Sequence, residues 1–346
     1  MVNQVMHTIY YISMHYIRGR TGGNDLPVAG ARSGHCKFAA ANPGGRHCPV
    51  GIVWEVRHEM KISESKCVGC GNCTYACPMG AIYVDPVTRK ATVNSDECVE
   101  CYACYNGLSK EHLPPRTVRF TRRMMSKLWL RFEPDPDICP TDALEPDELS
   151  WPRVVRRAFS DPRVPHESTG VTGRGTEEVK TNEISNRIGI GMVGFTIEFG
   201  RPGVGVRFHQ IQEMSMALAA LGVKIQPKNP VTAMMSDVDT GKIRDDILNE
   251  KVLSAILEIA VPVERTEEII RTVWAVEKKI DTIVVLGVGT RCDEDGEERV
   301  VGPILERLGY TLKRAKTNLG LGRPQIREIL REAPASAEPA KDAVVA

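Results

Sequence analysis

The sequence predicts an α+β protein with two structured domains, and three observations carry this prediction. Eight cysteines form two regular runs between residues 61 and 147, which predicts a small cysteine-rich domain. From Gly189 onward, strand-like and helix-like segments alternate in the order βαββαβ, which is typical of a four-stranded antiparallel sheet backed by two helices. Prolines and glycines over residues 148–188 predict a linker or docking arm between them.

Length and charge limit the classes to which the protein can belong. The 346 residues leave room for two or three domains. The 45 basic and 44 acidic side chains nearly cancel, so net charge favours neither nucleic acid nor a membrane surface as the main partner. No stretch approaches about 18 uninterrupted apolar residues, so no membrane span is expected. The chain opens without a signal-peptide pattern, and thiols in this number then indicate the cytoplasm of an anaerobe.

Residues 1–60 are predicted to be an irregular N-terminal extension. Within it, the dipeptide His35-Cys36 recurs as His47-Cys48. Two histidines and two cysteines could form a four-coordinate zinc site or help to hold another cluster. The alternative is a pair of ordinary thiols in a loop.

The two cysteine runs are the strongest signal in the chain. The first run is Cys67-x-x-Cys70-x-x-Cys73-x-x-x-Cys77-Pro78, and the second is Cys98-x-x-Cys101-x-x-Cys104 with a late Cys139-Pro140. Structural zinc prefers paired C-x-x-C knuckles, and disulfides belong mainly to small secreted domains. Three cysteines at even spacing followed by Cys-Pro favour iron–sulfur clusters instead.

These runs resemble the bacterial-type ferredoxins that carry two four-iron clusters. The resemblance covers residues 61–147, about a quarter of the chain. It implies two [4Fe-4S] clusters, with the fourth cysteine of each run binding the other cluster. The implied ligands of cluster 1, called the first set, are Cys67, Cys70, Cys73 and Cys139. Those of cluster 2, called the second set, are Cys77, Cys98, Cys101 and Cys104.

The chain departs from this family at residues 105–138, which stand where a ferredoxin has three residues. Residues 116–131 of this insertion contain six cations and no acid: Arg116, Arg119, Arg122, Arg123, Lys127 and Arg131. Phe120, Met124 and Leu128 recur every four residues, so the sequence predicts a helix with an apolar stripe and a basic face. It could dock an acidic redox partner, or it could be a solvated face that merely covers the domain.

The βαββαβ pattern has six predicted elements. Strands are expected at 192–199, 223–235, 252–261 and 282–288, and helices at 208–221 and 267–280. A further helix at 301–308 and a strand at 311–315 follow, and residues 326–346 read as a disordered tail. Gly287-Val288-Gly289 lacks the third glycine of a dinucleotide loop, and Cys292 stands alone.

The turn Phe199-Gly200-Arg201-Pro202-Gly203-Val204-Gly205 and the helix after it resemble an ACT-type regulatory domain. The resemblance covers about residues 189–290, within a domain expected at 189–325 that includes a C-terminal extension. The resemblance implies an effector site beside Arg201, Gly203 and Gly205. Alternatively these residues only make a tight turn, and the sheet edge pairs with a second copy of the chain. The second interpretation is favoured.

Together these features predict an iron–sulfur electron-transfer protein rather than a catalyst. Two clusters with all-cysteine ligation form a relay, so the expected role is the electron-relay subunit of a larger oxidoreductase with a catalytic partner. Two alternatives remain. One is a redox- or metabolite-sensing regulator that uses the ACT-like domain. The other is an enzyme or accessory protein of reductive sulfur or cofactor metabolism, which would need Cys36, Cys48 or Cys292 as a reactive thiol.

Overall fold

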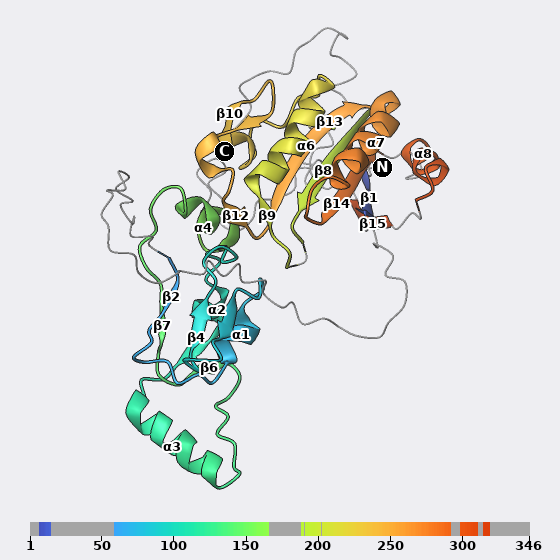
Figure 1. Cartoon of the computed structure of the whole chain (residues 1–346). Helices are drawn as coiled ribbons and strands as arrows, with labels where there is room; N and C mark the ends of the chain where they lie inside the picture. The colour runs from blue at the N-terminus through green and yellow to red at the C-terminus, as the bar shows by residue number, and fades with distance from the viewer. Residues whose placement is uncertain are drawn as a thin grey trace, which may run out of the picture. The chain divides into compact units, whose positions relative to one another are not determined.

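The computed structural model describes residues 7–14, 59–165, 188–189, 191–201, 203–291, 298–310 and 314–318. For 7–14 and 314–318 only the backbone is described. We call residues 61–147 the cysteine-rich domain, and the five-stranded sheet with its helices the sheet domain (Figure 1).

The sheet domain is built on one antiparallel sheet. Its strand order is β13-β8-β14-β1-β15. The bounds of these strands are β13 Ala255–Pro262, β8 Met192–Phe199, β14 Val284–Arg291, β1 His7–Met14 and β15 Arg314–Asn318. In β8, which pairs with a strand on each side, Phe195 lies opposite Ile259 on β13 and Val288 on β14. Aromatic and β-branched residues favour this extended, buried position.

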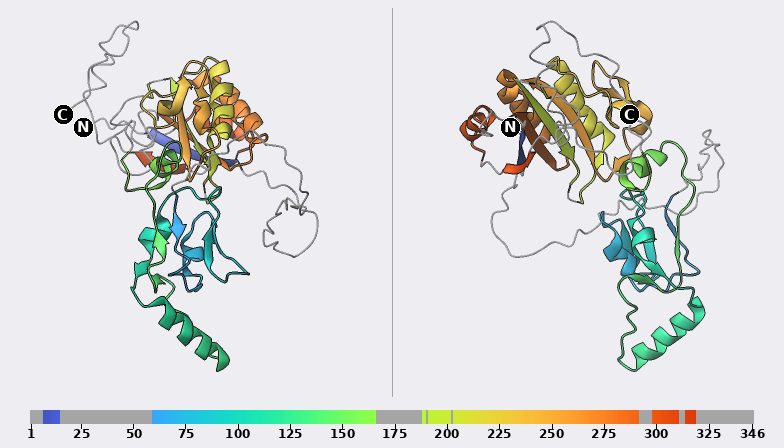
Figure 2. Two further views of the ribbon diagram at one scale, coloured as in Figure 1. Left: turned by 60° about the vertical axis from the view of Figure 1, so that its left-hand side comes forward. Right: turned by 180° about the vertical axis from the view of Figure 1, so that it is seen from behind.

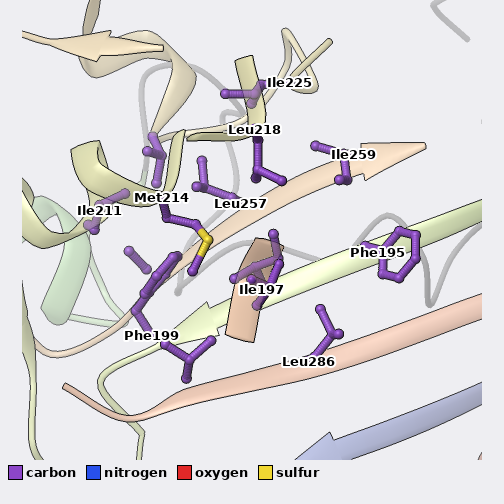
Figure 3. Packing of buried hydrophobic residues seen from close by; sticks show 14 of the residues in the cluster. Phe195, Ile197, Phe199, Ile211, Met214, Leu218, Ile225, Leu257, Ile259 and Leu286 are labelled. Carbon is purple, nitrogen blue, oxygen red and sulfur yellow. The ribbon is translucent and has the colours of Figure 1, made fainter. Parts of the chain in front are cut away.

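Two helices cover one face of the sheet, namely α6 (Phe208–Ala220) and α7 (Thr266–Glu277), as Figures 1 and 2 show. Ile211, Met214 and Leu218 recur every three or four residues along α6, and all three are fully buried. They point at Ile197 and Leu257 of the sheet (Figure 3). A third helix, α8 (Val301–Arg307), adds Val301 and Leu305 to the same core.

The sheet differs from the prediction in two places. The expected second strand over 223–235 is reduced to a single bridge between Ile225 and Ile259, followed by the 3₁₀ turn η2 (Thr232–Met234). Pro227 and Pro230 have no amide hydrogen to donate, so a regular strand cannot continue through them. The four-stranded expectation is also wrong, because β1 from the N-terminal extension and β15 add two strands beyond β14.

Short elements connect β8, β13 and the helices. They are β9 (Val206–Arg207), β10 (Met235–Asp237), β11 (Lys242–Ile243), η3 (Asp245–Ile247), β12 (Lys251–Val252) and η4 (Val263–Arg265). β10 pairs with β11 and β12 pairs with β9, each in an antiparallel arrangement. The strand predicted at 252–261 is therefore split into β12 and β13.

The cysteine-rich domain is made of very short elements. In chain order they are β2 (Lys61–Ile62), α1 (Asn72–Ala76), β3 (Ile82–Val84), β4 (Ala91–Val93), α2 (Ala103–Gly107), β5 (Ser109–Lys110), α3 (Pro115–Lys127), β6 (Ile138–Cys139) and β7 (Leu144–Glu145). Strands β3 and β4 pair as an antiparallel hairpin, with Ile82 opposite Val93. β2 pairs with β7 and so joins the two ends of the domain.

The stretch predicted to connect the two domains contains an ordered helix, α4 (Val154–Ser160). Its Val155 and Phe159 belong to the core of the sheet domain, and the Phe159 ring meets Phe208 edge to face at 5.2 Å between centroids. Among the described residues, no helix is both long and apolar enough to cross a bilayer.

Candidate metal centre

The four thiols of the first set line one cavity in the cysteine-rich domain. Cys73 lies on α1 and Cys139 on β6, while Cys67 and Cys70 come from the loop before α1. The Asn72 side-chain amide donates to the carbonyls of Asp135 at 2.7 Å and Ile138 at 2.8 Å. The returning end of the insertion is thereby held against α1, and this brings Cys139 to the other three.

The four thiols of the second set line another cavity. Cys104 lies on α2, and Cys77 is the C-cap residue of α1, so α1 and its cap position one thiol for each cavity. Cys73 of the first set and Cys104 of the second set belong to the same buried cluster, so the two sets adjoin. The structure thus brings together each group of four that the sequence pattern assigned, including the late Cys139.

The cavity walls supply hydrogen bonds that the spacing does not reveal. The amide of Ala81 donates to the Cys77 sulfur at 3.2 Å, and the amide of Ala143 donates to the Cys139 sulfur at 3.3 Å. Gly69 and Ala91 donate to Cys67 at 3.4 and 3.3 Å. Hydrogen bonds to ligand sulfur stabilise the thiolate and tune cluster potentials. Each donor to Cys77 and Cys139 stands four residues after its cysteine, which is a repeat visible in the sequence.

Burial changes the acidity of these thiols. Burial, with a smaller contribution from neighbouring thiolates, raises the pKa of Cys73 and of Cys104 to about 12. Burial also raises the pKa of Cys98, Cys70 and Cys101. Without iron these thiols hold their protons, so metal binding must release protons and supply the positive charge that keeps thiolates in an apolar cavity. The donor set fits [4Fe-4S] clusters, which take four cysteine thiolates each.

Arginines support both cysteine loops from outside the two runs. Arg153, the N-cap residue of α4, binds the fully buried Glu100, with its Nη2 2.7 Å from Oε1, beside the second cavity. Arg156, one turn later, donates to the carbonyls of Ser95, Asp96 and Cys98 at 2.7–3.1 Å. Sequence reasoning missed these residues, because α4 fell in the stretch expected to be a connector.

The first loop has a matching pair on α3. Arg119 donates to the carbonyls of Ser65 and, at 3.1 Å, of Cys67. Arg122 donates to the carbonyls of Val68 and, at 3.3 Å, of Gly69. The basic character of the insertion did indicate these side chains, but not that they would turn toward the cysteine loop.

The remaining predicted residues have other placements. Gly203 and Gly205 lie beside the segment after Cys77, because an added β-carbon would come within 3.0 Å of the Pro78 carbonyl and 2.8 Å of the Met79 methyl group respectively. Arg201 pairs with Glu198 at 3.2 Å. His35, Cys36, His47, Cys48 and Cys292 lie outside the described residues.

Comparisons with known proteins agree with this centre. Residues 59–107, which hold seven of the eight cysteines, match the 4Fe-4S dicluster domain family. The chain is therefore similar to proteins with two [4Fe-4S] clusters, and the two-cluster content is supported. The matched residues are a small part of the chain, and no solved structure matches it.

Three relatives illustrate the range of proteins that carry this domain. An uncharacterized ferredoxin of Methanocaldococcus jannaschii is 34% identical over 20% of this chain and 42% of its own length. An iron–sulfur protein of Rhodospirillum rubrum is 37% identical over 22% of this chain and 36% of its own. The indolepyruvate oxidoreductase subunit IorA of Thermococcus kodakarensis is 43% identical over 16% of this chain and 8% of its own. The chain spans less than half the length of each of these relatives.

Proposed function

We propose that this protein is an electron relay, in which the first set holds cluster 1 and the second set holds cluster 2. It would pass single electrons between protein partners as a subunit of a larger oxidoreductase, in the cytoplasm of an anaerobe. The observation that carries the proposal is the pair of adjoining cavities, each lined by four thiols. The similarity to a ferredoxin and to an oxidoreductase subunit supports an electron-transfer role.

The chemistry of one-electron storage belongs to the clusters when they are bound. The residues of the chain would set the conditions for it. Buried apolar neighbours such as Val99 and Leu144 keep water from the thiols, and the amides of Ala81, Ala91 and Ala143 donate to sulfur. These donors stabilise added negative charge and so raise the potential, whereas burial lowers it. The expected potentials are on the order of −400 mV.

Anaerobic purification with a redox titration tests the proposal. We expect about eight iron atoms and about eight sulfide ions per chain. Electron paramagnetic resonance should detect two one-electron reductions during the titration. Magnetic coupling between the two reduced centres is also expected, because the cavities adjoin. Colourless protein with far less iron, or centres that cannot be reduced near this range, would contradict the relay.

One observation favours a second function, a metabolite-sensing regulator. The glycine turn 200–205, which carries the resemblance to ACT-type domains, packs against Pro78 and Met79, immediately after a cysteine of the second set. An effector at this turn would therefore alter the surroundings of one cluster. A shift in one of the two potentials on adding amino acids would favour this function, and unchanged potentials with every amino acid would exclude it.

A further inference from the structure

We propose that α3 and the residues after it, up to Arg131, dock an acidic electron-transfer protein beside the first set. This inference rests on the proposed relay function and names the surface and the chemistry of the partner. We call residues 115–131 the docking segment. Its partner would present an apolar recess bordered by carboxylates.

The docking segment is attached to the first cysteine loop. Arg119 and Arg122 reach that loop and bind its backbone carbonyls, including that of Cys67. Val118, on the inner side of the helix, is buried. No other described element lies over the outer side of α3, as both views in Figure 2 show. A protein bound to this helix would therefore sit next to the first set.

The outer side of the segment is apolar and exposed. Phe120, Met124 and Leu128 form one stripe and are 66%, 43% and 65% exposed. Trp129, the residue after Leu128, is 96% exposed. A basic border accompanies the stripe, since Arg123 and Lys127 lie on the adjacent face. Helices that dock in protein grooves use apolar anchors at this spacing, and tryptophan and arginine dominate binding energy at interfaces.

Trp129 occupies a backbone position that ordinarily favours glycine. The helix ends with amide bonds from Trp129 to the Ser126 carbonyl and from Leu130 to the Met125 carbonyl, which is the Schellman arrangement. The φ angle of Trp129 is +60°, in the left-handed region where a side chain crowds the backbone. The chain thus keeps a large exposed ring where the smallest residue would fit better, and a contact with a partner supplies a reason.

A groove of positive charge beside the helix selects the class of partner. It is lined by six cations and by one acid, Glu133; the cations are Arg89, Lys90, Arg119, Arg122, Arg123 and Arg131. Cys67 and Cys70 lie on the same wall. In the described part of the chain, no carboxylate pairs with Arg89 or Arg123. A flat lipid surface could meet the helix but could not fill a concave groove, whereas the acidic side chains of a protein could enter it.

Stopped-flow kinetics with two haem proteins tests the inference. The full chain with its clusters is reduced anaerobically with dithionite, which is then removed, and mixed with ferric cytochrome b5, an acidic protein. One electron leaves a reduced cluster and converts ferric haem to ferrous haem. We expect the second-order rate constant to exceed that with the basic protein cytochrome c, and to fall as salt increases.

Two variants should slow this reaction. Trp129→Gly removes the ring and relieves the left-handed backbone, so it should lower the rate about tenfold without loss of iron. The double variant Arg123→Gln with Lys127→Gln should lower the rate about tenfold at low salt. The matched control is Lys228→Gln with Lys279→Gln, which removes the same charge from the sheet domain and should change the rate less than about twofold.

The outcomes separate the two proposals. Equal rates for wild type, Trp129→Gly and Arg123→Gln with Lys127→Gln would overturn the docking segment. A second result would also overturn it: the wild type binds phosphatidylglycerol vesicles tightly and Trp129→Gly does not, while both react with the haem proteins at the same rate. The exposed face would then bind a membrane rather than a protein. Clusters that dithionite cannot reduce would instead overturn the relay function, and the docking inference with it.

Discussion

Individual residues around the cysteines show that the two runs have the same backbone with different side chains. Gly69 and Gly71 have φ angles of +68° and +89°, and the matching residues of the second run, Glu100 and Tyr102, have +53° and +56°. A left-handed residue with a side chain costs about 1–2 kcal/mol. In the second run Glu100 binds Arg153, and the Tyr102 ring packs under Arg157 at 4.3 Å. These contacts offset the cost, so the second loop depends on α4.

The first loop instead needs glycine for space. A β-carbon on Gly69 would lie 2.0 Å from the Arg89 carbonyl oxygen, which no adjustment of a side chain can relieve. We expect Gly69→Ala to destabilise the domain by roughly 3 kcal/mol or more and to empty the cluster 1 site. Iron content and urea midpoints measure this. Gly80→Ala is the matched control, since Gly80 is also left-handed at +63° but has open space around it. Equal losses in both variants would contradict the steric explanation.

The assignment of Cys139 can be tested by one substitution. Serine is a poor cluster ligand, so Cys139→Ser should lose cluster 1 and retain cluster 2. The iron content should fall from about eight to about four atoms per chain. Iron and sulfide analysis with redox titration would show one remaining reduction. Cys292→Ser should keep about eight iron atoms. If Cys139→Ser also kept about eight, the fourth ligand of cluster 1 would have to be another residue.

Among the elements, α3 and α4 support the two cysteine loops in the same way, through arginine side chains. Arg119 and Arg122 lie on α3, while Arg153 is the N-cap residue of α4 and Arg156 lies on it. The members of each pair are three residues apart, and each pair binds the carbonyls of one cysteine loop. Charged donors to backbone carbonyls are stronger than neutral ones, and positive charge near a cluster favours its reduced form. The two pairs differ in whether carboxylates balance the charge of the arginines. Arg153 and Arg156 bind Glu100 and Glu250, whereas Arg119 and Arg122 bind carbonyls without a carboxylate in the described structure.

Of these four arginines, Arg156 is the one whose substitution should lower the stability of the protein most. Its side chain is buried and binds three carbonyls and the carboxylate of Glu250, whose side chain is only 13% exposed. Arg156→Met leaves that carboxylate without a counter-charge, so the stability should fall by about 3–5 kcal/mol. Denaturant unfolding and the rate of iron loss to a chelator measure the effect. Arg163→Met, at an exposed position just after α4, should change stability by less than about 0.5 kcal/mol. A mild effect of Arg156→Met would show that α4 does not support the loop.

At the scale of the whole molecule, the two domains have hydrophobic cores of unequal size, and ion pairs connect the domains. The core of the sheet domain contains large buried side chains such as Phe195, Phe199 and Phe208. The core of the cysteine-rich domain has eleven buried residues among those described, four of them cysteines. Arg207 and Lys251 of the sheet domain pair with Asp96 and Glu97, which precede the second run.

This imbalance predicts what happens when iron is removed. Without clusters the small core lacks its central contacts, so we expect residues 61–145 to lose protection from hydrogen exchange. The amides of β8, β13 and β14 should stay protected, because their core contains no cysteine. Hydrogen-exchange mass spectrometry before and after chelation tests this. Protection of β3 and β4 in the iron-free protein would show that the small core is sufficient without metal.

Local patterns predicted a large share of this structure. The spacing of cysteines within seven or eleven residues indicated the chemistry, and periodicity placed β8 at 192–199, as observed, and α6 within one residue. The prediction of a second strand at 223–235 failed because two prolines outweighed the apolar residues around them. The position of β1 could not be read from its sequence, since its partner β14 lies far along the chain.

Residue types and spacings were thus enough for the cluster chemistry, for the grouping of the cysteines into two runs and for the main helices and strands of the sheet domain, because these depend on neighbours within one or two turns of chain. Folding in three dimensions was needed to show that Arg119, Arg122, Arg153 and Arg156 hold the cysteine loops, and that Trp129 stands exposed beside them. Those contacts join residues about 50 to 60 positions apart. Such pairings depend on how whole elements pack, which no local pattern encodes.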